Sequence, residues 1–525
     1  MRIFRTTAGH RWLMSRTRVR RALLGALILT FAPFPLVAQE PAPRLPEPVR
    51  AYVEIPPLTA TGRTVAIPAD GNLQAALDAA QPGDTLVLEA GATYTGPFTL
   101  PNKPGSGWVT IRSSRLDQGL PPAGARVSPQ DADAMPKLVT RHGSALIAAK
   151  GAHHYRFVGL EIAPTPGAFL YNLIDIGTGH GPEQLANHFI FERSYIHGDA
   201  KVGSRRGIAM NASHMAVTDS YLADFKDPNS DSQAICGWNG PGPFKIVNNY
   251  LEGAGENVMF GGARPSIPNL VPSDIEIRAN HFSKPLAWKG NRWSVKNLAE
   301  LKNARRVLFD GNLFEHSWAH SQVGFAIVLT PRGAVGDTPW ATVEDITFTN
   351  NIVRHAVHGV NIMGRDGQSA RTASRILIRN NLFTDITGQL FQILRGPTDV
   401  VIDHNTGVAG KAVILADGTA ASNFTLRNNL VAYGQYGIIG TGTSPGTQTI
   451  SRYFPGATIN GNVFFGGQSV AKYPPGNTFV PLGRVGLVAP SAGDWRLRPD
   501  SPFRQRASDG KDVGVDVAEL SNAQR

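Results

Sequence analysis

The chain is 525 residues long, contains 56 glycines, 38 prolines and one cysteine, and carries a formal charge of +11. Its length exceeds that of an ordinary domain, which predicts either several domains or one elongated repeat structure. The single cysteine, Cys236, excludes an intramolecular disulfide and any cysteine-rich metal site. The abundance of glycine and proline favours short strands joined by many turns over a helical protein.

The N-terminal residues 1–39 have the pattern of a secretory signal peptide. Residues 1–21 hold seven arginines and no acid, and a short apolar run follows, interrupted by Pro33 and Pro35. We expect an exported, periplasmic or extracellular protein with no membrane span in the mature chain. Removal of this segment takes away seven positive charges and no negative ones. The formal charge falls from +11 to +4, which does not indicate a nucleic-acid partner.

The next two segments lead into a repeat array. Residues 40–65 are rich in proline and are expected to form an extended linker. Leu73 and Leu77 then fall on one face of a helix predicted over 72–81, and Pro82-Gly83 ends it. A short amphipathic helix before an array of strands predicts a cap on the exposed apolar end of that array.

The remainder of the chain repeats a short unit, a strand of alternating pattern followed by asparagine and further apolar residues. Examples are "IVNNYLEG" at 246–253 and "IRNNLFTD" at 378–385. The aligned asparagines are Asn249, Asn280, Asn312, Asn351, Asn381, Asn405, Asn429 and Asn462. They recur every 24 to 39 residues, which predicts a β-solenoid whose coils carry loops of different length. Asparagine suits a sharp turn, and stacked coils would align these amides in a ladder.

At this point the sequence resembles a known group. The cap helix, the "NNLF"-type coils and the closing "GDWRLRPDSPFRQRASDGKDVGVDV" at 493–517 are similar to secreted bacterial proteins of the pectate-lyase-like superfamily. The resemblance implies an all-β fold, a single-stranded right-handed parallel β-helix over 66–480, with a C-terminal tail, 481–525, packing on it. We expect a monomer. This architecture hosts lyases, hydrolases, epimerases and non-catalytic surface proteins, so the fold leaves the reaction open.

One segment resembles the calcium-and-base region of alginate lyases and chondroitinase-B-like lyases. It is "GAGENVMFGGARPS" at 253–266, in which Glu256 matches the first acid and Asn249 upstream matches an asparagine ligand. Val258 stands where a second acid is expected, and Arg264 lies one place beyond the expected lysine. Asp231 would complete a Ca²⁺ site from the previous coil. The alternative is that Glu256 hydrogen-bonds a turn.

A second segment, "VKNLAELKNARRVLF" at 295–309, offers a base. Lys302 precedes one strand and Arg332 lies about one coil later, so stacking brings them close together. Elimination beside a uronate carboxylate needs that charge offset and a neutral base, roles we assign to Arg332 and Lys302. Glu300 and Lys296 are near enough in sequence to tune Lys302. The alternative is a solvated basic edge that discourages strand pairing.

Further candidates for sugar contacts lie in the same region. Five of the eight tryptophans fall within 238–340, and exposed tryptophan faces stack on sugar rings, whereas buried ones fill gaps. The predicted substrate-binding residues are Arg264, Glu300, Trp318 and His316. The pair His316 and His320 is four residues apart, but no HExxH motif accompanies it.

The sequence therefore predicts an exported, carbohydrate-active protein, a polysaccharide lyase that cleaves an acidic polysaccharide by β-elimination. Two alternatives remain open at this stage. One is a glycoside hydrolase on the same scaffold, which needs clustered carboxylates such as Asp224, Asp227 and Asp231. The other is a non-catalytic carbohydrate-binding surface protein.

Overall fold

A computed structural model describes residues 42–333, 338–367, 371–467 and 472–524, which belong to one compact unit, 40–525. The signal peptide predicted for residues 1–39 lies outside this range. Within the described residues, no helix is both long and apolar enough to cross a membrane.

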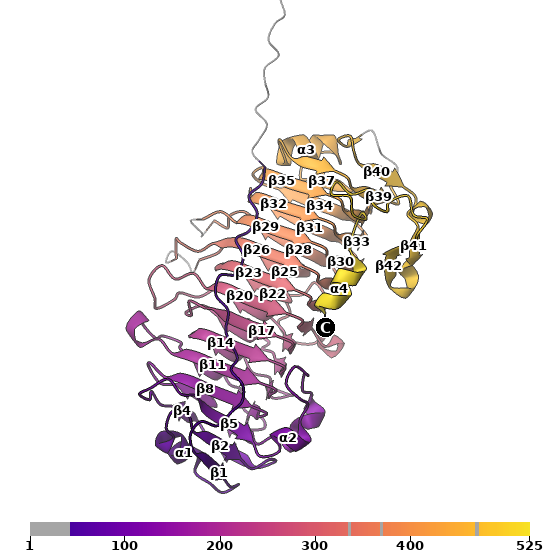
Figure 1. The fold of residues 1–525 in the computed structure, drawn as a ribbon. Helices are drawn as coiled ribbons and strands as arrows, with labels where there is room; N and C mark the ends of the chain where they lie inside the picture. The colour runs from indigo at the N-terminus through magenta and orange to yellow at the C-terminus, as the bar shows by residue number, and fades with distance from the viewer. Residues whose placement is uncertain (1–41, 334–337, 368–370, 468–471, 525) are drawn as a thin grey trace, which may run out of the picture. The chain divides into compact units, whose positions relative to one another are not determined.

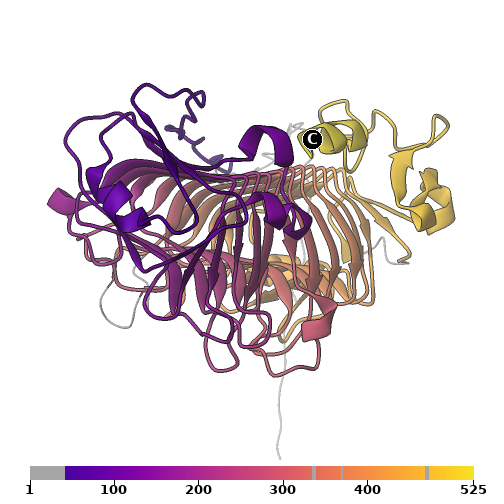
Figure 2. The same ribbon diagram turned by 90° about the horizontal axis from the view of Figure 1, so that it is seen from below.

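The chain winds into successive coils, and each coil of the stack adds one strand to each of three parallel sheets. Sheets A and B contain 14 strands each and sheet C contains 12, so the predicted parallel β-helix is confirmed. Within each sheet, a strand pairs in parallel with the corresponding strands of the coils before and after it. Figures 1 and 2 show the strands of successive coils stacked behind one another.

Within each of the three sheets, the strands follow one another in chain order. Sheet A comprises β1 (Thr64–Ile67), β2 (Thr85–Leu88), β5 (Val109–Ser113), β8 (His153–Val158), β11 (Asn187–Glu192), β14 (Ser213–Thr218), β17 (Phe244–Val247), β20 (Ser273–Arg278), β23 (Ala304–Asp310), β26 (Val343–Thr349), β29 (Ser374–Arg379), β32 (Thr398–Asp403), β35 (Ser422–Arg427) and β38 (Thr458–Asn460). Sheet B comprises β3 (Thr93–Thr95), β6 (Lys137–Thr140), β9 (Glu161–Pro164), β12 (Tyr195–His197), β15 (Tyr221–Phe225), β18 (Tyr250–Gly253), β21 (His281–Ser283), β24 (Leu313–Ser317), β27 (Ile352–Ala356), β30 (Leu382–Ile386), β33 (Thr406–Ala409), β36 (Leu430–Ala432), β39 (Val463–Phe465) and β40 (Thr478–Val480). Sheet C comprises β4 (Phe98–Leu100), β7 (Leu146–Ala148), β10 (Asn172–Ile176), β13 (Arg206–Met210), β16 (Gln233–Gly237), β19 (Glu256–Phe260), β22 (Ala299–Leu301), β25 (Phe325–Leu329), β28 (His358–Met363), β31 (Gln389–Leu394), β34 (Ala412–Asp417) and β37 (Ile438–Gly440).

Few helices accompany the sheets. They are α1 (Leu73–Ala79), α2 (Leu116–Gly119), α3 (Thr447–Tyr453) and α4 (Val517–Ala523). The predicted N-terminal capping helix is α1, whose first turn is capped by the Asn72 side chain accepting a hydrogen bond from the Ala75 amide. Leu73 and Leu77 are buried in the core that runs through the coils, so α1 covers apolar surface at the start of the stack.

The aligned asparagines form the predicted ladder, at the corner between sheets A and B. Asn351 illustrates the pattern: its Oδ1 accepts from the Asn312 amide and Nδ2, both at 2.9 Å, and its Nδ2 donates to Phe309 O at 3.1 Å and Asn381 Oδ1 at 3.0 Å. The ladder asparagine itself is buried. The left-handed turn residue is the one before it, for example Asn350 with φ 55° and Asn380 with φ 55°.

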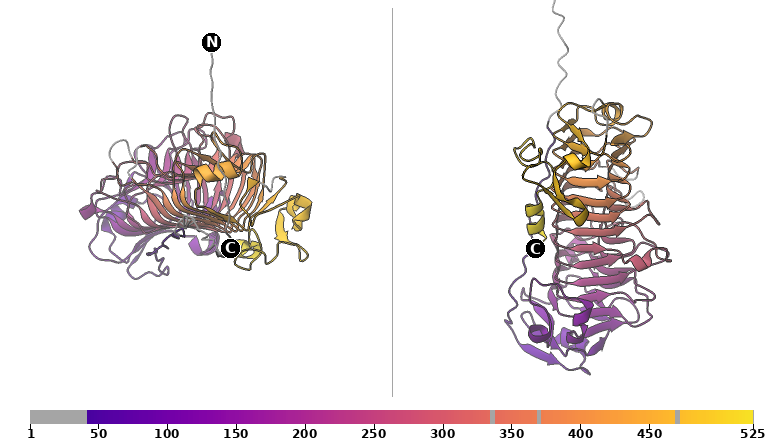
Figure 3. Two further views of the ribbon diagram at one scale, coloured as in Figure 1. Left: turned by 90° about the horizontal axis from the view of Figure 1, so that it is seen from above. Right: turned by 90° about the vertical axis from the view of Figure 1, so that its right-hand side faces the viewer.

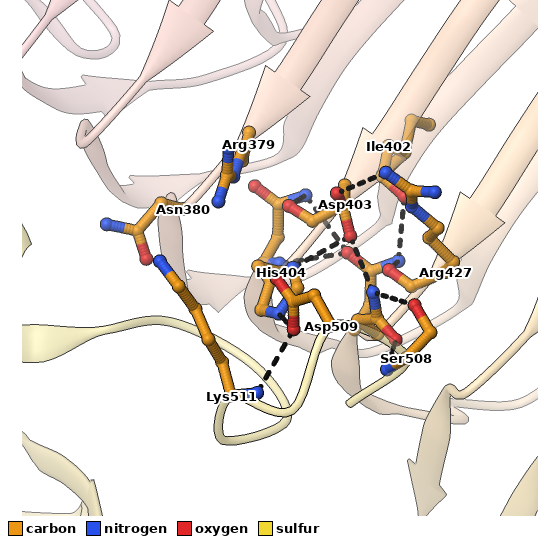
Figure 4. A network of polar contacts seen from close by, with 12 residues as sticks. Arg379, Asn380, Ile402, Asp403, His404, Arg427, Ser508, Asp509 and Lys511 are labelled. Atoms are coloured by element: carbon orange, nitrogen blue, oxygen red, sulfur yellow. Dashed lines mark hydrogen bonds and ion pairs between the residues drawn. The ribbon is translucent and has the colours of Figure 1, made fainter. Parts of the chain in front are cut away.

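The C-terminal segment, 481–524, lies on the flank of the coils (Figure 3) and continues from the antiparallel pair β41 (Leu487–Ala489) and β42 (Asp494–Leu497) to α4. Polar contacts hold it there (Figure 4). Ser508 and Asn428 exchange two hydrogen bonds of 2.9 Å. His404 links Asp403, at 2.8 Å, to Asp509 of the tail, at 3.3 Å.

We predict that Asn351→Ala lowers the free energy of unfolding by about 2–4 kcal/mol, because it removes the buried partner of the Asn312 amide, the Asn312 Nδ2 and the Phe309 carbonyl on the preceding coil. Denaturant unfolding measures the change. The matched control is Asn102→Ala, at an exposed asparagine outside the ladder. Equal effects of the two substitutions would show that the ladder does not stabilise the stack.

Candidate functional site

A row of buried polar side chains crosses the outer face of sheet C. Arg206, Gln233 and Glu256 occupy equivalent positions in β13, β16 and β19. Arg206 donates from Nε to Gln233 Oε1 at 3.0 Å, and Gln233 donates from Nε2 to Glu256 Oε2 at 2.7 Å. The Arg206 guanidinium also lies over the rings of Tyr171 and Trp238, each 5.1 Å from the ring centroid. The hydrogen bonds along the row and the two aromatic rings beside Arg206 therefore hold these side chains in place without a ligand.

Glu256 is a carboxyl group without solvent contact. Burial, together with the nearby carboxylates of Glu300 and Asp231, raises its pKa to about 8, although Lys302 and Lys296 oppose the shift. Its second oxygen, Oε1, is buried with no hydrogen-bond partner among the described residues. A protonated carboxyl group suits this environment, because it avoids placing an uncompensated charge there.

Lys302 is the first residue after β22, and Glu300 lies within that strand. The Lys302 Nζ and Glu300 Oε1 atoms are 3.5 Å apart, and Glu300 Oε2 accepts from Asn297 Nδ2 at 3.1 Å. Burial lowers the pKa of Lys302, but the carboxylates of Glu300, Glu256 and Asp231 outweigh it, and the net shift is upward. Lys302 is therefore held as a cation.

Four of the predicted residues thus come together, namely Lys302, Glu300, Glu256 and Asp231. Asp231 also forms an ion pair with Lys296, from the loop before β22. We call these five residues the charged cluster. Arg332 lies next to it on the adjacent coil, since its amide donates to Lys302 O at 2.9 Å. The Arg332 side chain is 48% exposed and approaches Asp366 at 3.7 Å.

Sequence reasoning missed a second lysine of this region, Lys284. It is fully buried and donates to Ala254 O at 3.0 Å, Gly255 O at 3.2 Å and Asn257 Oδ1 at 3.3 Å. Burial lowers its pKa to about 7, with Glu256 opposing the shift. Its ammonium group closes the turn before β19 and has no path to a ligand.

The proposed calcium ligands do not form a site. Asn249 is a ladder residue: its Nδ2 donates to Val217 O and Asn280 Oδ1, and its Oδ1 accepts from Ser220 N. Its role as a ligand is corrected, because both polar atoms are already engaged at a different corner of the coil. Lysine ammonium groups accompany Glu256 and Asp231, which disfavours a divalent cation. Among the described residues, no three His, Cys, Asp or Glu side chains are grouped to hold a metal.

His316 and Trp318 line a separate hollow of about 510 Å³. It lies at the C-terminal ends of the sheet B strands β24, β27 and β30. The ring of His316 stacks on that of His355 at 5.5 Å, and His355 Nδ1 is 3.2 Å from Asp385 Oδ2. Trp318 is only 7% exposed and packs with Trp288 and Trp293. These tryptophans fill the space under loops, so the expected exposed stacking surface is absent at Trp318.

Two cations missed by sequence reasoning, Arg365 and Arg395, extend the row formed by the predicted residues Arg264, Lys302 and Arg332. Arg365 and Arg395 follow the ends of β28 and β31 just as Arg332 follows β25, and Arg264 lies beyond the end of β19. Lys302 is half-buried, whereas Arg264, Arg332, Arg365 and Arg395 are exposed. We call these five residues the basic edge. A basic residue soon after each of the strands β19, β22, β25, β28 and β31 is the signal that could have revealed it.

Comparisons with known proteins bear on the fold. No family model matches the sequence, and no curated protein matches it. Among solved structures, a mannuronic acid specific polysaccharide family 6 lyase from human gut microbiota is 13% identical, with 80% of this chain and 92% of that chain covered and a TM-score of 0.50. Pectate lyase Pel9A is 12% identical, with coverage of 87% and 96% and a TM-score of 0.36. PfbA, a surface adhesin of Streptococcus pneumoniae, is 11% identical, with coverage of 70% and 87% and a TM-score of 0.46.

The chain has a parallel β-helix fold, as the resemblance in sequence predicted, and shares it with the family 6 lyase. At this level of identity the likeness concerns the fold alone.

We predict that Glu256→Gln preserves stability at low pH and raises it, relative to the unchanged protein, as pH increases. The folded pKa of about 8 lies above the ordinary 4.5, so the stability linked to Glu256 is present below about pH 4.5 and is lost as pH rises through about 8. Glutamine mimics the neutral acid and removes this dependence. Denaturant unfolding at about pH 5 and about pH 8 measures it.

The matched control for this prediction is Glu300→Gln. It removes the ion pair with Lys302 and is expected to lower stability. If Glu256→Gln also destabilises the protein more strongly at the higher pH, Glu256 is ionised and our assignment is wrong.

Proposed function

We propose that the protein acts on an acidic polysaccharide, which binds along the basic edge. This edge follows the C-terminal ends of successive strands of sheet C. The observation that carries this proposal is the sequence of five cations on five successive coils, Arg264, Lys302, Arg332, Arg365 and Arg395. Neighbouring coils are ~4.8 Å apart, so an extended polyanion can meet a new cation at each step. An exported protein, as the N-terminal pattern predicts, meets such polymers outside the cell.

We propose β-elimination as the reaction: a solvent base takes the proton next to the uronate carboxylate, a carbon–carbon double bond forms, the bond to the leaving sugar oxygen breaks, and that oxygen takes a proton from water. The proton next to a uronate carboxylate becomes acidic only when the carboxylate charge is offset, and electrostatic stabilisation of this kind contributes strongly to catalysis. Arg332 and Lys302 are on adjacent coils, where the Arg332 amide donates to Lys302 O, and each cation has a carboxylate neighbour, Asp366 and Glu300 respectively. This arrangement supports carboxylate recognition and charge neutralisation.

The role of Lys302 changes in this proposal. A base must be neutral before it takes the proton, and the neighbouring carboxylates raise the pKa of Lys302 instead of lowering it. Lys302 therefore acts with Arg332 as a partner for the substrate carboxylate. The fully buried Glu256 has no solvent contact and does not provide the acid that hydrolysis requires.

Incubation with pectate, alginate and glycosaminoglycans tests the function. We expect a soluble product with the ultraviolet absorbance of an unsaturated uronate. New reducing ends without this absorbance would replace the lyase proposal with a hydrolase. Retention on an acidic polymer without cleavage would indicate a binding protein, and neither binding nor cleavage of any acidic polymer would overturn the proposal.

We predict that Lys302→Arg keeps binding and activity within about threefold, whereas Lys302→Gln weakens binding by about tenfold, or ~1.4 kcal/mol. Arginine preserves the positive charge but resists deprotonation, so it substitutes for a charge partner and not for a base. Affinity electrophoresis and initial rates measure both effects. The control is Arg141→Gln, at an exposed arginine directly after strand β6 of sheet B. Full binding by Lys302→Gln, or complete loss of activity in Lys302→Arg, would contradict the assigned role.

A further inference from the structure

Residues 43–57, part of the predicted proline-rich linker, lie along the outer face of sheet A. We call this segment the N-terminal strap; Figure 1 shows it as an indigo trace crossing the strands of several coils. Three of its backbone amides donate to aspartates: Arg44 to Asp399 at 3.0 Å, Glu47 to Asp345 at 2.9 Å and Arg50 to Asp274 at 2.9 Å. Further on, Val53 is buried against Ile190 and Ala216.

The three aspartates belong to one column of residues on six successive coils. In order, the column is Asp274, Arg306, Asp345, Arg375, Asp399 and Asn423, from β20, β23, β26, β29, β32 and β35. All six have left-handed backbone angles, with φ between 51° and 59°. We call this row the acid–base column.

Ion pairs within the column hold two of its three carboxylates in place. Arg306 donates to both oxygens of Asp274, at 2.8 and 2.7 Å, and Arg375 does the same for Asp345, at 2.5 and 2.8 Å. Asp399 accepts from Asn423 Nδ2 of the column at 3.0 Å, and its ion pair, at 2.9 Å, is with Arg44 of the strap. With the strap in place, the side chains of Asp345 and Asp399 are only 1% exposed. An acceptor is therefore presented on every second coil, and each has a partner within the column.

The spacing of these acceptors matches the strap. Two coils rise by ~9.6 Å, while three residues of an extended proline-rich chain in the polyproline II conformation rise by ~9.3 Å. The strap contacts the column at every third residue, Arg44, Glu47 and Arg50. Its burial has the same period, because Pro43, Pro46 and Val49 are half-buried while the residues between them are exposed.

We propose that the acid–base column is a peptide-recognition surface that reads an extended chain in steps of three residues, and that the N-terminal strap is its ligand. Recognition uses backbone amides, so proline is excluded at positions 44, 47 and 50 and tolerated between them. The sequence "PRLPEPVR" at 43–50 meets this condition.

The bound strap connects coils that do not otherwise touch. In a solenoid each coil interacts mainly with its two neighbours, so stability is a sum of local terms. The three contacts join the strap to β32, β26 and β20. The donor and acceptor residues of each contact are 355, 298 and 224 positions apart in the sequence, respectively. Dissociation of the strap therefore loosens several coils at once.

Hydrogen exchange of the full chain, resolved to single amides by mass spectrometry, tests the proposal. We expect the amides of Arg44, Glu47 and Arg50 to exchange at least about tenfold more slowly than those of Leu45, Val49 and Ala51. Uniformly fast exchange over residues 44–51 would overturn the proposal, and so would protection without the three-residue period.

Insertion of one glycine between Glu47 and Pro48 provides a second test. It moves the Arg50 amide out of register with Asp274, so we expect Arg50 to exchange as fast as Val49 while Arg44 and Glu47 stay protected. The control is a glycine inserted between Thr59 and Ala60, both exposed and beyond the strap, which should leave all three amides protected. Continued protection of Arg50 in the first variant would contradict recognition by register, and the unmodified chain remains informative if that variant does not fold.

Discussion

The structure depends on the alignment of each coil with the next. Backbone hydrogen bonds join the strands of three sheets, but they alone leave the register between coils open, since a strand shifted along its neighbour forms equivalent bonds. The asparagine ladder removes that freedom. Each ladder asparagine donates from its backbone amide and its Nδ2 to the side-chain Oδ1 of the asparagine on the next coil, so a shifted coil leaves buried polar groups unpaired. Loops of any length can then leave the stack without disturbing its register.

Fixed register also explains how residues distant in sequence form one surface. Arg332 and Arg395 are 63 residues apart in the chain, yet each follows the end of a strand in sheet C, two coils apart. The same geometry builds the acid–base column on sheet A, where aspartate and arginine alternate on adjacent coils. In both places the repeat of the scaffold, ~4.8 Å, sets the spacing of the charges. The column is covered by the strap, while the basic edge presents exposed arginines to solvent.

The fold was predictable from the sequence because its signals are local and repeated. Asparagine followed by apolar residues marks the corner between sheets A and B on each coil from Asn249 to Asn462, and Leu73 and Leu77 mark the capping helix. Site residues were harder to assign from the sequence, because an asparagine can be either a metal ligand or a member of the ladder. Asn249 matched a ligand position by resemblance, but its place in the repeat already committed it to the ladder. The structure brings the predicted residues Lys302, Glu300, Glu256 and Asp231 close together, but the pKa of Lys302 depends on the balance between burial and three carboxylates, which no spacing in the sequence reveals. Burial likewise decides the role of Trp318.

The charged cluster and the basic edge are electrostatically linked. A protonated Glu256 contributes no negative charge, so Glu300 and Asp231 are the carboxylates that compensate Lys302 and Lys296. The cluster then approaches neutrality, and the positive charge that reaches solvent comes from the exposed arginines on either side of Lys302. Ionisation of Glu256 would add a negative charge beneath the basic edge and weaken its attraction for a polyanion, at a distance where the low-dielectric interior screens poorly. Burial of one neutral carboxyl group is thus part of what keeps this edge of sheet C positive.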